Sequence, residues 1–216
     1  MNWARWWPLT GIVFVALFFF GLMVSSTVDT HDTDSEILAH YAKHSNRVNQ
    51  FISFFLVLAG VLVFVWFLAH LRKRLAVAEG GQPLLTAVAF GGGLVASALW
   101  VVSNALFTGP AVAVSDTSKF TLDPNAYRLL NIIGYGVWIS GTTIAAALVF
   151  SVAILSLRTG FLPTWLTWLS FPVGITMLVS FFFVPFLIML GWFLVVSITL
   201  IVRPGPSPPA APAPTV

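Results

Sequence analysis

The chain has 216 residues, of which 58% are hydrophobic and only 8% are charged, with a formal net charge of +3. A water-soluble domain carries about 25% charged residues, so this composition excludes an ordinary soluble fold and favours a lipid environment. The absence of cysteine excludes disulfides, thiolate metal sites and a cysteine nucleophile, and the scattered basic residues do not form a nucleic-acid-binding face.

Five hydrophobic blocks follow one another along the chain, and the last is long enough to cross a membrane twice. One crossing needs about 20 apolar residues, whereas the last block runs from Trp165 to Val202, and Pro185 is the best helix breaker within it. We therefore expect an all-α, polytopic transmembrane helix bundle over residues 1–203. Its six spans are expected at about 9–28, 51–71, 84–107, 129–157, 165–181 and 186–202. Residues 204–216 are rich in proline and alanine, and we expect a disordered cytoplasmic tail there.

The distribution of basic residues predicts the orientation of these spans. The segments on one side of the membrane carry six basic residues and one acidic residue, whereas those on the other side carry four basic and six acidic residues. Lys and Arg favour the cytoplasmic side, and Arg72-Lys73-Arg74 is the strongest marker. Arg158 and Arg203 belong to the same side, which requires an even number of spans between them. We therefore expect both termini in the cytoplasm.

The segment 29–50 is the most polar part of the chain and predicts a short surface helix in the first outer loop. Thr33 and Glu36 fit a capping box, so we expect this helix to run from Asp34 to about Ser45. Three side chains able to bind a metal would then share one face: Glu36, His40 and His44. A solvated helix lying on the membrane surface explains the same spacing without a metal. We therefore assign no metal site and expect no cofactor.

Two loops carry signals for the ends of helices. Asp123 and Pro124 are suited to the N-cap and first position of the fourth span. Gly160 is suited to end that span, and Pro163 to open the next one. We expect these residues to have structural roles.

Polar side chains near the outer ends of the spans predict a second candidate site. Asn104 ends the third span, while Arg128, Asn131 and Tyr135 share one face at the start of the fourth. With Arg47 at the entrance of the second span, they could line an outward-facing vestibule for a small ligand or a lipid headgroup. Helix packing explains the same residues, because polar side chains hydrogen-bond across close helix contacts and Arg128 can snorkel to the interface. The sequence leaves both interpretations open.

Three segments carry a resemblance to a known family. They are Asp34-Ser35-Glu36-Ile37-Leu38-Ala39-His40-Tyr41, Leu71-Arg72-Lys73-Arg74-Leu75 and Leu157-Arg158-Thr159-Gly160-Phe161-Leu162-Pro163-Thr164-Trp165-Leu166. Their order resembles a family of uncharacterised bacterial membrane proteins, commonest in actinobacteria and catalogued as a domain of unknown function. The third segment looks like that family's Arg-x-Gly-x-Leu-Pro-x-Trp-Leu turn, and the resemblance covers nearly the whole chain except the tail. It implies six helices in a bacterial inner membrane and supplies no catalytic residues.

The sequence contains no catalytic motif that we recognise. No acidic residue lies deep in a span, no pair of intramembrane histidines is available for haem, and neither a Walker loop nor a zinc-protease motif occurs. We expect a non-enzymatic accessory, assembly or sensor-like protein, whose partners are the lipid bilayer and other membrane proteins or a second copy, and not nucleic acid. The alternative is a small transporter or channel with the outer vestibule. The third hypothesis is a metal-dependent lipid enzyme at the outer face.

Overall fold

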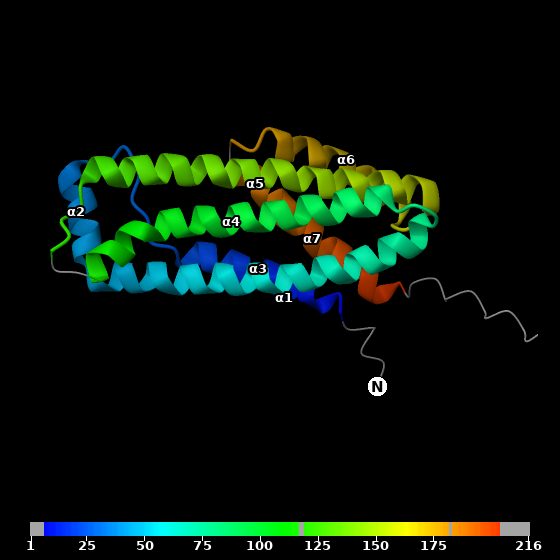
Figure 1. Ribbon diagram of the computed structural model, residues 1–216, viewed down its shortest axis with the longest axis horizontal. Coiled ribbons are helices and arrows are strands. Elements are labelled where there is room, and N and C mark those ends of the chain that lie inside the picture. Colours follow the sequence, from blue (N-terminus) through cyan, green and yellow to red (C-terminus); the bar gives the residue numbers. More distant parts are fainter. Residues whose placement is uncertain (1–6, 117–118, 182, 204–216) are drawn as a thin grey trace, which may run out of the picture.

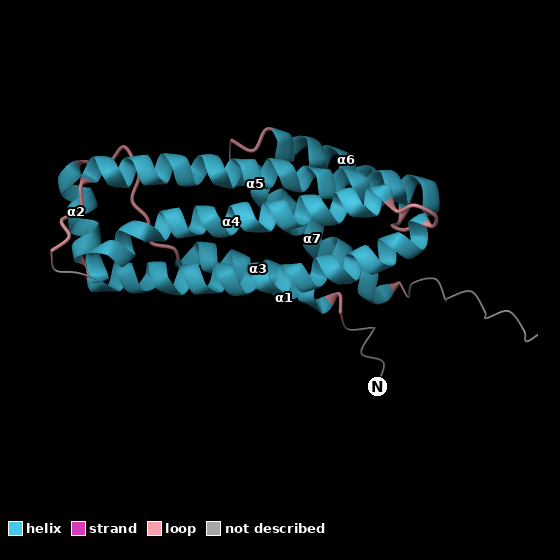
Figure 2. Ribbon diagram, viewed as in Figure 1, coloured by secondary structure: helices cyan, strands magenta, loops and turns pink. Residues whose placement is uncertain are grey.

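The computed structural model describes residues 7–116, 119–181 and 183–203, and within these residues the chain is helical without a strand (Figure 2). The helices are α1 (Leu9–Val24), α2 (Asp34–Ala42), α3 (His44–Glu79), α4 (Leu84–Asp116), α5 (Pro124–Thr159), α6 (Thr164–Leu178) and α7 (Phe183–Val202). The predicted all-α bundle is therefore confirmed. The expected tail over residues 204–216 lies outside the described residues.

The bundle has two layers. The long helices α3, α4 and α5 lie side by side in one layer (Figure 1). The shorter helices α1, α7 and α6 pack against this layer, with α1 on α3 and α6 on α5, and α7 contacts both α1 and α6. Helix α2 lies across one end of the long helices. We call this end the cap end, and the opposite end, which carries Arg72, Lys73, Arg74, Arg158 and Arg203, the basic end.

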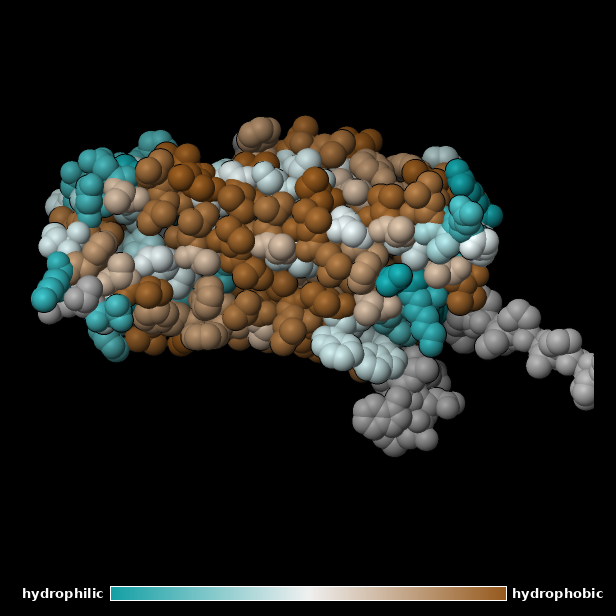
Figure 3. Space-filling model, viewed as in Figure 1, coloured by the Kyte–Doolittle hydropathy of each residue, from teal (hydrophilic) through white to brown (hydrophobic). Residues whose placement is uncertain are grey.

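Among the helices that the structure describes, four are long and apolar enough to cross a membrane, namely α3, α4, α5 and α7. Helices α1 and α6 are apolar but have only 16 and 15 residues. Large hydrophobic side chains are exposed along the flanks, including Phe20, Phe55, Leu62 and Ile132 at about three-fifths exposure each. Figure 3 shows hydrophobic residues along the length of the visible face and hydrophilic residues gathered at both ends. This distribution is typical of a membrane protein, because lipid replaces water around the middle of the bundle.

Local signals at several helix ends act as expected. Asp123 caps α5 by accepting a hydrogen bond from the backbone N–H of Asn125, with Pro124 as the first helical residue. Gly160 ends α5 in the left-handed conformation, at a φ of 67° that favours glycine. Helices α6 and α7 separate between Leu178 and Phe183. Pro185 therefore lies in the first turn of α7, where its missing N–H leaves no helical hydrogen bond unmade.

The predicted C-terminal limit of the surface helix is wrong. Helix α2 ends at Ala42, Lys43 is extended, and α3 begins directly at His44. Side chains from the first turn of α3 satisfy the last carbonyls of α2. Asn46 donates to the carbonyl of His40, and Arg47 donates to those of Tyr41 and Ala42. The chain can therefore turn sharply without leaving these carbonyls unpaired.

Aromatic side chains fill the middle of the bundle. Seven of them from four helices are at most 1% exposed and form a continuous cluster: Phe14, Phe18, Phe64, Phe67, Trp100, Phe186 and Phe193. The rings of Phe14 and Phe64 have centroids 4.3 Å apart. Gly141 of α5 passes over this cluster, and a Cβ atom placed there would lie 2.9 Å from Cδ1 of Trp100. The core therefore requires glycine at this position to bring α4 and α5 together.

Candidate functional site

The most connected group of polar residues lies at the cap end. The segment 25–33, here called the strap, leaves α1 and leads into α2 (Figure 1). The strap and α2 together cover the first turns of α3 and α5 and the last turns of α4. We call this assembly the polar cap.

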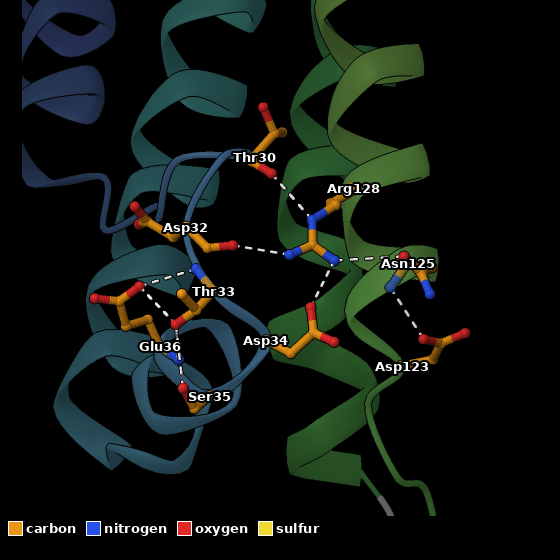
Figure 4. Close-up of polar contacts among 9 residues, drawn as sticks. All are labelled: Thr30, Asp32, Thr33, Asp34, Ser35, Glu36, Asp123, Asn125 and Arg128. Atoms are coloured by element: carbon orange, nitrogen blue, oxygen red, sulfur yellow. Dashed lines mark hydrogen bonds and ion pairs between the residues drawn. The ribbon is translucent and has the colours of Figure 1, made fainter.

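Arg128 ties the strap and α2 to α5 (Figure 4). Its Nε donates to the carbonyl of Thr30 at 3.0 Å and its Nη2 to that of Asp32 at 2.8 Å. Its Nη1 lies 2.7 Å from a carboxylate oxygen of Asp34 in the first turn of α2. Since the Arg128 side chain is only 26% exposed, these bonds form in a partly dehydrated site, where hydrogen bonds to charged groups contribute most.

Two short-range contacts shape the strap and the start of α2. The backbone N–H and the ring of His31 both lie within 2.9 Å of Oδ1 of Asp29, and the backbone bond is the main reason that the pKa of Asp29 is below its usual value. Glu36 completes the predicted capping box, with one carboxylate oxygen 2.7 Å from the hydroxyl and 2.9 Å from the backbone nitrogen of Thr33. The hydroxyl bond and then the backbone bond lower the pKa of Glu36.

Beneath α2 lies a small apolar cluster separate from the main core. Its buried members are Ile37, Tyr41, Ala111, Leu122 and Tyr127. The rings of Tyr41 and Tyr127 have centroids 5.4 Å apart, and the Tyr127 hydroxyl donates to the carbonyl of Val28 in the strap. Burial, with a smaller effect of Tyr127, raises the pKa of Tyr41 above its usual range. The cluster anchors α2 to α4 and α5 by burying apolar surface.

Gln50 joins the strap to α3 and α4. Its side chain is 1% exposed, and its Oε1 accepts from the hydroxyl of Ser25 and the backbone N–H of Ser26, each at 3.2 Å. Its Nε2 lies 3.5 Å from both the carbonyl of Phe107 and the hydroxyl of Thr108. Every polar atom of this buried amide therefore has a partner, as burial requires.

The three candidate metal ligands do not converge. Glu36 is engaged in the capping box, and His44 belongs to α3 rather than α2. His40 has Nε2 3.1 Å from the carbonyl of Ser26 and Nδ1 3.1 Å from the amide nitrogen of Asn46, so both ring nitrogens have partners within the protein. Over the described ranges, no group of three His, Cys, Asp or Glu residues lies close enough to hold a metal.

The five residues of the proposed vestibule do not form one site, because their side chains bond at four different places. Arg47 and Arg128 both belong to the polar cap, where Nε of Arg47 donates to the hydroxyl of Ser115 at 3.1 Å. Asn104 is 8% exposed and donates to the carbonyl of Phe54 at 3.2 Å, which joins α4 to α3.

The other two vestibule residues lie farther along α5. Asn131, also 8% exposed, donates to the carbonyl of Tyr127 one turn earlier. Tyr135 is 42% exposed, and its hydroxyl donates to the carbonyl of Phe181 between α6 and α7. The two arginines therefore hold opposite ends of α2, Arg47 the C-terminal end and Arg128 the N-terminal end with the strap, whereas Asn104, Asn131 and Tyr135 are engaged elsewhere.

At the basic end, polar side chains close two helix ends that the sequence analysis did not single out. Glu79 accepts from the backbone N–H groups of Leu85 and Thr86, each at 2.8 Å, and so caps the start of α4. Arg74 donates to the carbonyls of Leu200 and Arg203 at 2.8 and 2.9 Å, and so caps the end of α7. An acidic residue before a glycine pair and a helix start is the signal that could have indicated the role of Glu79.

Comparison with known proteins adds no relative. No family model, no curated protein and no solved structure matches this chain.

Proposed function

We propose that this chain is a six-span integral protein of a bacterial inner membrane, with both termini in the cytoplasm, and that it acts as a non-enzymatic accessory or assembly protein. In this arrangement the polar cap faces outward and the basic end faces the cytoplasm. The excess of acidic residues in the segments at the cap end and of basic residues in those at the other end supports this orientation. The location in a bacterial inner membrane follows from the sequence resemblance alone, since no family model matches the chain.

The observation that carries the proposal is that the bundle is closed at the polar cap and filled at its centre. Arg128 and Gln50, which would be suited to recognise a solute, use their polar atoms to hold the strap. Below them, Phe18, Trp100 and Phe186 pack together across three helices with at most 1% exposure. A transporter has to open a path between such side chains, whereas an accessory protein needs only a stable body and an exposed flank.

The exposed flanks offer surface for a partner protein within the membrane. On α5, Ile132 and Ile144 are 63% and 40% exposed, with Gly136 and Ser140 exposed between them. On α1, Met23 is 58% exposed on the other layer of the bundle. Because the two flanks lie on different layers, a specific partner is expected to contact one of them and not the other.

Site-specific photocrosslinking in living cells tests the accessory role. A photoreactive residue is placed at Ile132, at Ile144 or at Met23, and the adducts are resolved by mass. An accessory or assembly protein gives one discrete protein adduct from the positions of one flank, and that adduct is absent from the other flank. If every position yields lipid adducts alone, the accessory proposal is wrong.

A further inference from the structure

Among the residues that the structure describes, the basic end carries cations without a carboxylate partner. Arg72, Lys73 and Arg203 are exposed, whereas the two ion pairs that the described residues form within 4.0 Å both lie at the cap end. Glu79, the acidic residue of this end, has its carboxylate engaged with backbone N–H groups at the start of α4. The charge of these three cations is therefore available to an anion from outside the chain.

Arg74 connects the two parts of this cationic surface, which are Arg72 and Lys73 on α3 and Arg203 at the end of α7. Its guanidinium is bonded to the carbonyls of Leu200 and Arg203, so it is itself engaged. These bonds fix the end of α7, with Arg203, against the Arg74 side of α3. Arg72 lies on the opposite side of α3 from Arg74, with its guanidinium carbon 4.9 Å from the ring centroid of Phe90, and Lys73 lies between the two.

A pair of exposed tryptophans lies next to these cations, toward the middle of the bundle. The indole rings of Trp7 and Trp66 stack with centroids 6.0 Å apart, and the two residues are 39% and 56% exposed. Trp66 and Lys73 are seven residues apart on α3 and therefore share a face, with about 10 Å between them along the axis. Exposed indole rings favour the boundary between acyl chains and headgroups. With Trp66 at that boundary, Lys73 lies at the level of the lipid phosphates.

We propose that Lys73, with Arg72 and Arg203 on either side of it, binds the phosphate of an anionic phospholipid headgroup, whose acyl chains lie along the Trp7–Trp66 pair. An anionic lipid carries a net negative charge that balances these cations. A zwitterionic lipid has no net charge, and the ammonium group of its headgroup is repelled by the cationic surface. The proposal rests on the membrane location given above, and it is independent of the accessory role.

Native mass spectrometry of the full chain in a neutral detergent tests this site. Phosphatidylglycerol and phosphatidylcholine with identical acyl chains are titrated separately, and the wild-type chain is expected to retain phosphatidylglycerol more tightly. Lys73→Gln lowers this affinity about fivefold and Arg72→Gln/Lys73→Gln about thirtyfold, at about 1 kcal/mol for each cation near a charged membrane surface. Lys73→Arg keeps the charge and the affinity. Lys43→Gln, an exposed lysine at the cap end, is the matched control and leaves the affinity unchanged.

Three results overturn the proposal. The first is equal retention of the two lipids by the wild-type chain. The second is the same loss of affinity in Lys43→Gln as in Lys73→Gln. The third is saturation of the site by inorganic phosphate in the absence of lipid, which assigns it to a free anion. Circular dichroism of each variant confirms that the helices remain, and none of these results alters the photocrosslinking test of the accessory role.

Discussion

Replacing Arg128 by glutamine is expected to release the strap while leaving the rest of the bundle folded. The substitution removes the ion pair with Asp34 and the paired donors that reach the carbonyls of Thr30 and Asp32. The shorter amide side chain can replace at most one of these bonds.

The cost follows from the type and the exposure of the lost contacts. Each hydrogen bond from a charged group contributes about 1.5–3 kcal/mol, whereas the ion pair adds about 1 kcal/mol at most, because the Asp34 side chain is 66% exposed. Allowing for one bond regained by glutamine, we expect the strap to be destabilised by about 2–4 kcal/mol. The population of molecules with an open cap then rises roughly thirtyfold to a thousandfold.

The rate of cysteine labelling measures this opening, because the chain has no native cysteine to give a background. Ala111→Cys places a thiol at a site in the cluster under α2 that is 0% exposed, and Ala146→Cys places one in the main core at 1% exposure. Arg128→Gln is expected to accelerate maleimide labelling at position 111 by the factor given above and to leave position 146 unchanged. Arg128→Lys keeps the charge but has fewer directed donors. Its labelling rate at position 111 is expected to lie between those of the wild-type chain and Arg128→Gln.

Two outcomes contradict the role of Arg128. An unchanged rate at position 111 means that the strap does not depend on this side chain. An equal acceleration at positions 111 and 146 means that the substitution loosens the whole bundle.

Three further substitutions test the core and the polar cap. Gly141→Ala introduces a Cβ 2.9 Å from the indole of Trp100 and is expected to lower the free energy of unfolding by about 1–3 kcal/mol in a denaturant titration. Gly136→Ala is the control and has little effect, because nothing lies within 4 Å of its added Cβ. Gln50→Ala leaves buried groups of the strap unpaired and is expected to cost about 1–3 kcal/mol, while Gln82→Ala at an exposed loop position is neutral. Because the pKa of Glu36 is below its ordinary value of 4.5 in the folded chain, its carboxylate stabilises α2 in full at a pH above 4.5. This contribution is lost as the pH falls from 4.5 through the lower pKa of the folded state. The protection factors of the α2 amides, which correct the exchange rates for their intrinsic slowing at low pH, are therefore expected to fall on acidification in the wild-type chain, and this fall is expected to be smaller in Glu36→Gln.

Several helix ends could be predicted because their partners are close in the sequence. Thr33 and Glu36 are three residues apart, Asp123 caps a backbone group two residues on, and Gly160 needs only its own positive φ. Such signals depend on a few neighbouring residues, so the sequence contains all the information that they require.

The contacts of Arg128 could not be predicted in the same way. Its partners at positions 30 and 32 are almost a hundred residues away and are backbone carbonyls, which every residue type provides. The position of Arg128 near a helix start indicated an interfacial side chain, but nothing in the sequence indicated that the strap would cross to α5.

The limits of the long helices also differ from the hydrophobic blocks for a physical reason. Helix α3 begins at His44, seven residues before its hydrophobic block, and α4 continues to Asp116, nine residues beyond its block. Hydropathy marks the part of a helix that lies in hydrocarbon, whereas a helix continues for as long as its backbone groups are paired. The polar cap is built on these extensions, so its location was less predictable than that of the spans.

Labelling of intact cells with a membrane-impermeant maleimide is the most direct test of the six-span arrangement. Single cysteines replace three exposed residues, Ser35 in α2 at the cap end, and Thr159 and Arg203 at the basic end. With six spans, position 35 is labelled in intact cells, and positions 159 and 203 are labelled only after the membrane is permeabilised. Labelling of position 203 in intact cells, with position 159 protected, contradicts two crossings by α6 and α7 and with them the six-span arrangement.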